Sequence, residues 1–567
     1  MNIFRKLIPA STLFGALLLS LNLAAQIAPP AQPDPPKNWH EMDLKADGFY
    51  GISLTPAYQF IKGKKSKTVL VATIDSGIDT AQKDLQGILW VNPKEIPGNG
   101  IDDDHDGFVD DVHGWDFLGG PGGKVDFTET TEEVREYNRL KGKYLNATTA
   151  APGEEKEYAY WLSVKSTYDE TMAKSKGELP QVQQMATVLM VTSGYIKSAL
   201  HLNADATFTL ADLSKINAVN DTLKQSKTVW TELFTEEGPA SDNSKILKDI
   251  SEYLAKINND VNPDLTARQR IVGDDPNVRD GKPYGNNVLK LADASHGTGV
   301  AGLIGAKRDN GYGINGVADN VRIMAIKAVP NGDEYDKDIA NAIRFAVDHG
   351  AKVVNMSFGK KLSPHKAWVD EAFKYAAAND VLLVQASGND NSDVDDKPEF
   401  PNAYFLDGTS GTDNVISVGA SSAVLGDHLA ASFTNYGQKS VDVFAPGVKV
   451  TSIDMDAEFN TEDGTSFSSP ITAGIAALIL EYYPDQRKSY FEVKERLEKL
   501  DLVLPNTIHV GGPIAVADAL NLLGTGGHGA IDPVEGLIYR IERKGAVDFL
   551  VKYVRPPAKK MVFTFLK

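Results

Sequence analysis

Two short runs rich in Val, Leu and Ile constrain the fold of this chain more than any other feature. Val69–Ile74 leads into Asp75, and Val381–Ala386 leads into a Ser-Gly-Asn turn that ends at Asn389. Such runs are typical of strands buried on both faces of a parallel sheet. We therefore predict an α/β fold with Asp75 and Asn389 at the carboxyl edge of the sheet, where open α/β sheets place their sites.

A turn of small residues, Gly464–Pro470, precedes an apolar segment at 471–480. Proline is tolerated near a helix N-terminus, where its missing N–H goes unused, and breaks a helix elsewhere. The predicted helix therefore begins close to Ser466 and presents that hydroxyl beside free backbone N–H groups. For an isolated Gly-Thr-Ser, a capping turn without chemistry is the commoner explanation.

Ser466 is not isolated, because two other segments carry the groups that a serine needs before it attacks a carbonyl. These groups are a base that takes the hydroxyl proton and an acid that holds the base in the right tautomer. His296 lies near the start of a predicted small-residue helix at 295–301, and Asp75 ends the first buried strand. We expect the three to act together, with the Asn389 amide donating to a developing oxyanion.

The chain order Asp75, His296, Ser466 is that of the subtilisin-like serine peptidases, and the chain resembles that family. The resemblance implies hydrolysis of polypeptides through an acyl-enzyme. It also implies roles for single residues: Asp75 orients His296, His296 is general base and then general acid, and Ser466 is the nucleophile. Asn389 and the backbone N–H of Ser466 form the oxyanion hole.

Three flanking motifs extend the resemblance and indicate how much of the chain it covers. They are Asn355–Gly359 (NMSFG), Phe433–Gly437 (FTNYG) and Ala445–Gly447 (APG). The resemblance covers roughly residues 45–115 and 285–523. We accordingly predict a catalytic domain in two parts, 45–125 and 285–523. It implies a subtilisin-like parallel sheet with helices on both faces.

Alternative functions remain open beside this one. A maturation protease with a narrow substrate range has the same chemistry, and a catalytically silent binding protein has the same scaffold. Lipases and esterases are disfavoured, because the segment around Ser466 lacks the Gly-x-Ser-x-Gly pattern of their nucleophile.

By resemblance, the substrate residue before the scissile bond lies in a slot between two extended segments. The predicted substrate-binding residues of these segments are Ser357, Phe358, Gly359, Ala386, Ser387 and Gly388. The motif carried across Phe400-Pro401 puts Glu399 at the floor of the slot and Asp390 at its rim. Two carboxylates there favour lysine or arginine on the substrate. Pairing of Lys397 with Glu399 would cancel that preference.

An acidic loop follows the first strand. Gly100–Asp111 alternates carboxylates and then places Gly107 at a tight turn, as at the start of a calcium loop. The predicted ligands are Asp102, Asp104, Asp106 and Asp110. A complete EF-hand loop carries glutamate at its twelfth position, where this chain has His113. We therefore predict a free-standing calcium loop with a structural Ca²⁺, and a solvated acidic turn is the alternative.

A second cation site follows from the resemblance alone. Asp84 lies nine residues after Asp75, as does a ligand in many subtilases, and Asp309 follows the predicted helix that carries His296. Sodium or a water molecule would fit this site equally well in place of calcium.

The acid and the base are separated by 221 residues, far more than in compact subtilases, which indicates an insertion. We place it at residues 126–284. Helical spacing predicts four to six helices there, at 132–145, 154–175, 181–202, 210–226 and 244–258, with a break at Leu179-Pro180. The insertion is either a lid over the substrate cleft or a decoration away from it.

The N-terminus has the pattern of an export signal. Arg5 and Lys6 precede an apolar stretch that ends at Ala24-Ala25, so residues 1–25 are predicted to be a cleaved signal peptide, with a signal anchor as the alternative. We expect a periplasmic or secreted protein without stable membrane insertion once the signal is removed. Residues 26–44 form only a short proline-rich segment, in place of the pro-domain that secreted subtilases commonly carry.

Composition narrows the chemistry and the partners. The chain has no cysteine, which excludes disulfides, a thiol nucleophile and thiolate metal sites. Its net charge of −18 becomes two units more negative when the signal is removed. Such a surface repels nucleic acid and attracts calcium ions or basic polypeptide substrates. The oligomeric state is left open.

The C-terminal extension, residues 524–567, begins with a glycine-rich hinge. Alternating patterns predict strands at 536–542, 546–554 and 560–565.

Overall fold

The computed structural model describes residues 35–237, 242–291, 294–409, 414–423, 429–484, 537–544, 547–554 and 561–564. The chain divides into two compact units. The sheet unit comprises the described parts of residues 33–127 and 266–567, and the helical unit is 128–265. The predicted signal peptide lies outside the described residues. Within them, no helix combines the length and the apolar character that a membrane span requires.

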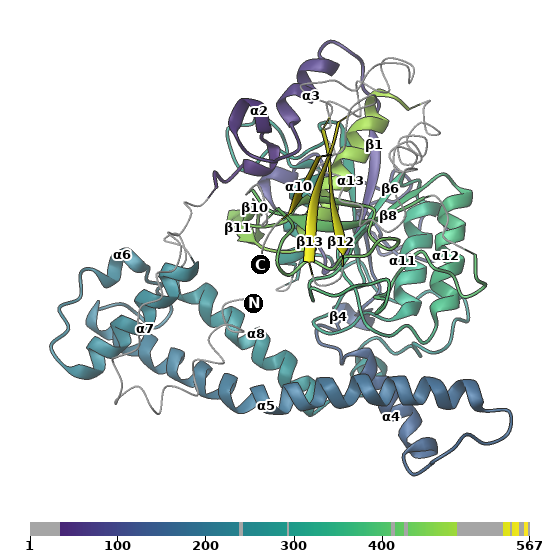
Figure 1. Cartoon of the computed structure of the whole chain (residues 1–567), viewed down its shortest axis with the longest axis horizontal. Coiled ribbons are helices and arrows are strands. Elements are labelled where there is room, and N and C mark those ends of the chain that lie inside the picture. Colours follow the sequence, from purple (N-terminus) through teal and green to yellow (C-terminus); the bar gives the residue numbers. More distant parts are fainter. Residues whose placement is uncertain are drawn as a thin grey trace. The chain divides into compact units, whose positions relative to one another are not determined.

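A seven-stranded parallel sheet forms the centre of the sheet unit (Figure 1). The strands lie in the order β2-β5-β1-β6-β7-β8-β9. Their bounds are β1 Val69–Asp75, β2 Gly114–Asp116, β5 Val321–Lys327, β6 Val353–Met356, β7 Leu382–Ala386, β8 Val415–Ser421 and β9 Val443–Pro446. Both strands predicted from apolar runs, β1 and β7, lie inside this sheet, so the predicted α/β class is confirmed.

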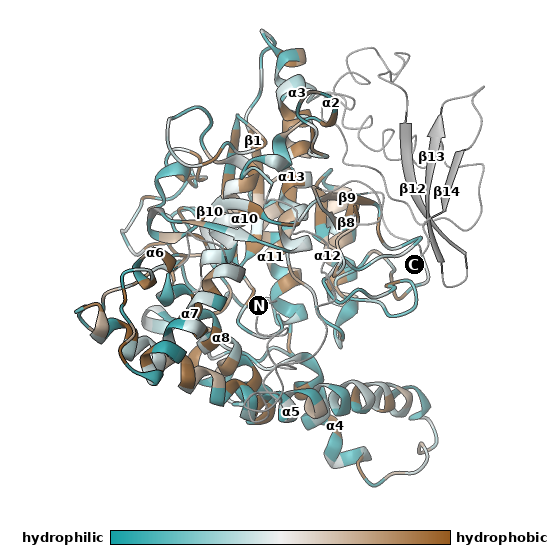
Figure 2. Cartoon of the chain, turned by 60° about the vertical axis from the view of Figure 1, so that its left-hand side comes forward, coloured by the Kyte–Doolittle hydropathy of each residue, from teal (hydrophilic) through white to brown (hydrophobic). Residues whose placement is uncertain are grey.

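Helices cover both faces of the sheet, as predicted. They are α10 Ser295–Gly305, α11 Asp336–Asp348, α12 Lys366–Ala378 and α13 Thr465–Tyr482. One apolar core joins the strands to α10 and α13, and a second joins them to α11 and α12. Neighbouring residues of β1 enter different cores, Val71 the first and Ala72 the second. The strands β1, β8 and β9 are accordingly largely hydrophobic in Figure 2.

This topology gathers the predicted catalytic residues at one edge. Asp75 is the last residue of β1, and Asn389 follows β7 by three residues. His296 and Ser466 are each the second residue of a helix, α10 and α13. The prediction that a helix begins close to Ser466 is therefore confirmed.

Shorter elements complete the sheet unit. They are η1 Trp39–Glu41, α2 Leu44–Asp47, α3 Leu54–Ile61, η2 Lys83–Leu85, β3 Gly119–Gly120, η3 Pro121–Gly123, β4 Lys124–Val125, α9 Ala267–Ile271, β10 Val450–Ile453, η4 Met455–Ala457 and β11 Phe459–Glu462. Trp39 is fully buried, and its Nε1 donates to the carbonyl of Val448 at 3.1 Å. Trp39 thus belongs to an apolar core of the sheet unit, although it lies in the predicted N-terminal segment, 26–44.

The helical unit contains five helices in its described part, within the predicted range. They are α4 Glu132–Tyr144, α5 Glu155–Ala199, α6 Leu210–Leu213, α7 Asp221–Glu237 and α8 Asn243–Val261. Its core includes Phe208, Trp230 and Phe234, which are fully buried and in mutual ring contact. The unit therefore has a hydrophobic core of its own.

The predicted break at Leu179-Pro180 is wrong, because α5 continues through Pro180. Its partner α8 contacts it on both sides of the proline. Ser175 Oγ donates to Asp260 Oδ2 at 2.9 Å before it, and Val182 is fully buried in the shared core after it. Tertiary packing thus outweighs the lost backbone hydrogen bond, which costs about 3 kcal/mol in an isolated helix.

The helix predicted at 210–226 is instead two helices. Thr209 and Asp212 form a capping box that starts α6, and the Asn220 side chain accepts the Leu223 N–H at 2.9 Å where α7 starts. Two separate N-terminal caps within a dozen residues favour a turn between them over one continuous helix.

The C-terminal strands are confirmed. β12 Leu537–Lys544, β13 Val547–Val554 and β14 Met561–Thr564 pair antiparallel in one small sheet.

Candidate active site

Asp75 and His296 form a hydrogen-bonded pair at the carboxyl end of β1. His296 Nδ1 lies 2.7 Å from Asp75 Oδ1, which also accepts the N–H of Ser76 at 2.8 Å. A carboxylate only accepts, so Nδ1 carries the proton and Nε2 is the basic nitrogen of the neutral ring. Asp75 is 1% exposed, so the pair is held in a low-dielectric position.

Glycines let helix α10 approach β1 closely enough to make this pair. A Cβ on Gly297 would lie 2.1 Å from the carbonyl oxygen of Gly77 and 3.2 Å from Asp75 Cβ. Gly77 itself has φ +102°, a conformation that favours glycine. The small-residue sequence after His296 is therefore a packing requirement of the site.

The electrostatic setting of His296 makes it a stronger base than a free imidazole. Burial lowers its pKa, but the negative charge of Asp75 and the hydrogen bond to it outweigh burial and raise the pKa to about 9. The side chain is 34% exposed, so its outer edge is open to solvent. The neutral form, which can take a proton, accumulates as the pH rises through this pKa.

Ser466 and Ser357, the residue after β6, exchange two hydrogen bonds. Its Oγ donates to the carbonyl of Ser357 at 3.2 Å, and Ser357 Oγ donates to the carbonyl of Ser466 at 2.8 Å. Asn355 Nδ2 in turn donates to Ser357 Oγ at 2.9 Å. Within the described residues the Ser466 hydroxyl is thus bonded to Ser357 and not to His296. The Ser466 O–H must turn from the Ser357 carbonyl toward His296 before its proton can pass to the base.

Asn389 is oriented by Thr465, a residue for which the sequence predicted no role. Asn389 Oδ1 accepts both the N–H and the hydroxyl of Thr465, each at 2.9 Å. The hydroxyl of Thr465 also accepts the Gly388 N–H at 3.2 Å. Because its oxygen is occupied, the Asn389 amide has only its Nδ2 donors to offer a ligand.

Asn389 Nδ2 lies near the backbone nitrogen of Ser466, beside Gly464. A point at the position of a Gly464 Cβ lies 3.6 Å from the Ser466 nitrogen and 3.8 Å from Asn389 Nδ2. An oxyanion is stabilised by two N–H donors that surround it in this way. The structure therefore places near each other the two groups that the resemblance implied.

Glu399 lies between the two predicted walls of the substrate slot. A Cβ on Gly388 would lie 2.2 Å from Glu399 Oε2, and one on Gly359 would lie 3.4 Å from the same oxygen. Phe400 and Lys360 exchange two backbone hydrogen bonds of 2.9 Å, which fixes the register of the Glu399 segment beside Gly359. The Glu399 carboxylate thus lies between Gly359 and Gly388, and its role as the floor of the slot stays a prediction.

The surroundings of Glu399 favour its protonated form near neutral pH. Burial raises its pKa, as do the charge of Asp390 and a hydrogen bond to it, and the result is about 8 although Asn435 and Lys361 act in the opposite sense. Among the described residues no ion pair joins Lys397 to Glu399, so the predicted cancelling contact is not formed.

The acidic loop is organised around its own backbone. Asp110 accepts the N–H groups of Gly98, Asn99 and Gly100 at 2.7 to 3.3 Å, and Asp102 accepts those of Asp106 and Gly107. Asp110 thus holds the preceding turn and is not among the carboxylates whose oxygens converge in the described part of the chain.

Among the described residues, two groups of converging ligand atoms include carboxylates of this loop. One is Glu95, Asp102 and Asp104, and the other is Asp104, Asp106 and His349. Glu95 was not predicted from the sequence, because it lies outside the alternating pattern. Asp104 belongs to both groups, and neither of its carboxylate oxygens has a hydrogen-bond partner among the described residues. These donors fit a divalent cation.

The second predicted cation site, Asp84 with the segment Asp309–Gly311, centres on Asp84. Asp84 lies against the loop after α10, where Asn310 Nδ2 donates to its Oδ1 at 2.6 Å and the Ile314 N–H donates to its Oδ2 at 2.9 Å. The Asp309 N–H instead donates to Asn315 Oδ1 at 2.8 Å. The structure thus brings Asp84 together with Asn310, and the carboxylate of Asp309 is exposed.

Comparisons with known proteins agree with this geometry. The pattern of the Subtilase family matches residues 66–500. The thermophilic serine proteinase of Bacillus sp. (strain AK1) is 37% identical over 206 residues, which are 36% of this chain and 46% of that protein. The cell wall-associated protease of Bacillus subtilis (strain 168) is 33% identical over 216 residues, 38% of this chain and 22% of that protein. Subtilisin DY of Bacillus licheniformis is 36% identical over 220 residues, 38% of this chain and 73% of that protein.

The chain thus spans less than half the length of the first two relatives and most of the third. The family pattern, in contrast, takes in most of this chain, from the start of β1 to beyond α13. This chain therefore belongs to the subtilase family of serine peptidases.

Proposed function

We propose that this protein is an exported serine endopeptidase that hydrolyses polypeptides through an acyl-enzyme. The observation that carries the proposal is the 2.7 Å pairing of His296 with Asp75 at the sheet edge that also holds Ser466 and Asn389. Membership of the subtilase family supports it. Export is supported by the pattern of residues 1–25 and by the name of one relative, a cell wall-associated protease.

The proposed reaction starts when the Ser466 hydroxyl turns from the Ser357 carbonyl to His296 Nε2. His296 takes the proton as Oγ bonds to the substrate carbonyl carbon, and the carbonyl electrons move onto oxygen. Asn389 Nδ2 and the Ser466 N–H donate to that oxyanion. His296 then gives its proton to the leaving amine, and a water repeats the sequence on the acyl-enzyme to release the acid and restore Ser466.

Digestion of a long unstructured polypeptide tests the endopeptidase assignment. Wild type is expected to release internal fragments, each with a new N-terminus, while Ser466→Ala releases none. Removal of single residues from the chain ends only, or equal cleavage by both proteins, would contradict the proposal.

The oxyanion donors give a prediction that separates binding from catalysis. Asn389→Ala should lower kcat by about 10²- to 10³-fold with little change in KM, which is the magnitude measured on subtilisin, itself a member of this family. Thr465→Val removes one of the two hydrogen bonds that orient Asn389 and should cost about tenfold in kcat. Steady-state kinetics on one peptide amide measures both, and Thr465→Ser, which keeps the hydroxyl, is the control. A loss confined to KM would refute the positioning role of Thr465.

Glu399 gives the proposed substrate preference, which is for Lys or Arg before the scissile bond. A charge-assisted hydrogen bond contributes about 1.5 to 3 kcal/mol, so Glu399→Gln should lower the preference for Lys over an uncharged residue by about 10- to 100-fold. The preference of wild type should grow as the pH rises through about 8, because Glu399 then loses its proton.

The measurement is the ratio of kcat/KM for two peptides that differ only in that residue, from pH 6 to about 10. Taking the ratio cancels the titration of His296, which affects both peptides equally. Asp390→Asn is the companion variant, since it removes the neighbouring charge and should shift the rise to lower pH. A ratio that is flat with pH in wild type and unchanged by Glu399→Gln would exclude Glu399 from the slot.

The acidic loop is proposed to hold a structural Ca²⁺ through Glu95, Asp102 and Asp104, and Asp84 is the proposed anchor of a second, weaker cation site. Calcium at roughly 100 times its dissociation constant should stabilise the fold by about 2.7 kcal/mol. Thermal melts with Ca²⁺ and with chelator, all in a Ser466→Ala background, test this. Asp104→Ala should remove most of the response, whereas Asp205→Ala, at an exposed position of the helical unit, should keep it. Equal midpoints with Ca²⁺ and chelator would refute the calcium role.

A further inference from the structure

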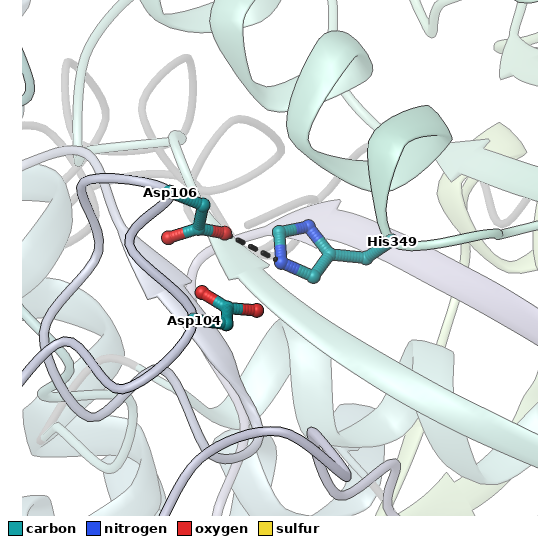
Figure 3. Close-up of side chains that lie close together, drawn as sticks. All are labelled: Asp104, Asp106 and His349. Carbon is teal, nitrogen blue, oxygen red and sulfur yellow. Dashed lines mark ion pairs between the residues drawn. The ribbon is translucent and has the colours of Figure 1, made fainter.

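His349, at the C-terminal end of α11, faces the acidic loop from a distant part of the chain. Its Nε2 lies 2.9 Å from Asp106 Oδ2 and 3.3 Å from Asp111 Oδ2. Figure 3 shows Asp104 and Asp106 of the loop and the imidazole of His349 turned toward one another. One ligand atom of each of these three residues lies within 4.8 Å of the other two.

The ligand atom of His349 is Nε2, which gives up the proton it shares with Asp106 when a metal binds. Its Nδ1 lies 2.8 Å from the backbone carbonyl of Phe345, and since a carbonyl only accepts, Nδ1 carries the proton. A histidine that binds a metal commonly donates its other ring N–H to a carbonyl in this way. The rings of Trp90 and Phe345 contact the imidazole at centroid distances of 5.4 and 4.2 Å and fix its plane.

One carboxylate of this cluster lacks a hydrogen-bond partner among the described residues. The Asp104 side chain is 5% exposed, and neither of its oxygens is hydrogen-bonded. Asp111, by contrast, accepts from Asn92 Nδ2 at 2.7 Å and pairs with His349 at 3.3 Å. The nearest ammonium is that of Lys94, which lies 3.4 Å from Asp104 Oδ2 and is 69% exposed. Burial of the Asp104 carboxylate beside only this exposed ammonium is costly, which favours a bound cation.

We infer that Asp104, Asp106 and His349 bind a divalent transition-metal ion of the zinc, cobalt or manganese class. Calcium takes oxygen ligands, whereas an imidazole nitrogen with carboxylates suits transition metals. Ligands about 2.05 Å from a tetrahedral metal stand roughly 3.3 Å apart. The 2.9 Å from His349 Nε2 to Asp106 Oδ2 needs only a few tenths of an ångström more.

This centre differs from the proposed calcium site in its ligands and in what it connects. It shares Asp104 with the calcium group but adds a nitrogen donor from α11. An ion there ties the loop after β1 to the end of α11, segments that are far apart in the sequence. The inference does not depend on peptidase activity.

Metal titration of the full chain tests the inference. Metal-free protein with Ser466→Ala, which prevents self-digestion, is titrated with Co²⁺ while its visible absorption is followed, and separate samples are melted with Zn²⁺ or Ca²⁺. One Co²⁺ per chain should give a visible spectrum that Zn²⁺ abolishes, and Zn²⁺ should raise the melting temperature. His349→Asn should weaken Co²⁺ and Zn²⁺ binding at least tenfold and leave the Ca²⁺ shift in place.

His105→Asn is the matched control, because His105 is an exposed imidazole on the same loop. It should bind Co²⁺ like the parent. Asp106→Asn serves as a second test if His349→Asn fails to fold, since Asp106 is more exposed and the amide keeps its shape. The inference would be overturned if the parent gave no Co²⁺ spectrum. It would also be overturned if the parent and the variant that folds bound Co²⁺ with equal affinity. His349 would then form only an ion pair with the loop.

Discussion

Ser466→Ala and His296→Ala should each abolish amide hydrolysis while the fold persists. The expected loss in kcat is about 10⁶-fold, which is the magnitude measured for the serine and the histidine of subtilisin, itself a member of this family. The physical reason is that nucleophile and base act as one unit. The double variant should therefore be no slower than either single variant.

Burst and steady-state kinetics on an activated peptide amide measure this loss, with circular dichroism to show that the variants are folded. Ser214→Ala, at an exposed serine of the helical unit, is the matched control and should retain full activity. Losses that multiply in the double variant would show that Ser466 and His296 do not act in one step.

Asp75→Asn should lower kcat/KM by about 10⁴-fold, the magnitude of the same change in another serine peptidase family. The change removes the charge that stabilises the imidazolium, and an amide N–H directed at Nδ1 would fix the wrong tautomer. It should also move the pH profile. The charge of Asp75 raises the pKa of His296 to about 9, so kcat/KM of wild type should rise through that region.

The direction of this pH shift follows from which protonation form of His296 is active. His296 must be neutral to take a proton, so activity is lost as the pH falls through its pKa. Without the Asp75 charge the pKa falls, and the acid limb of Asp75→Asn should lie at lower pH than that of wild type. The measurement is kcat/KM from pH 5 to about 10.5. An acid limb that stays in place would show that the group which titrates is not paired with Asp75.

The sequence predicted those parts of the site that depend on local pattern. Asp75 and Asn389 could be placed because buried strands are recognisable and their carboxyl ends share an edge. Ser466 could be placed because small residues and Pro470 mark a helix start. Glu399 was predicted from the motif around Phe400-Pro401, and the backbone pairing of Phe400 with Lys360 places its segment beside Gly359.

The remaining parts of the site and of the fold could not be predicted, because they depend on contacts between residues that are distant in the sequence. Thr465 lies next to Ser466, but its role follows from Asn389, which is 76 residues away. His349 has no motif around it and meets the acidic loop only through the docking of α11 on the sheet. Pro180 misled the prediction for the same reason, because the packing of α8 along α5 overrides a local break.

Covalent labelling with a fluorophosphonate, followed by mass spectrometry of the labelled peptide, tests the central claim most directly. We expect one label per chain on Ser466, in a reaction that accelerates as the pH rises toward 9 and is greatly slowed in His296→Ala. The absence of labelling in folded wild type, or a label on another serine that persists in Ser466→Ala, would contradict the account.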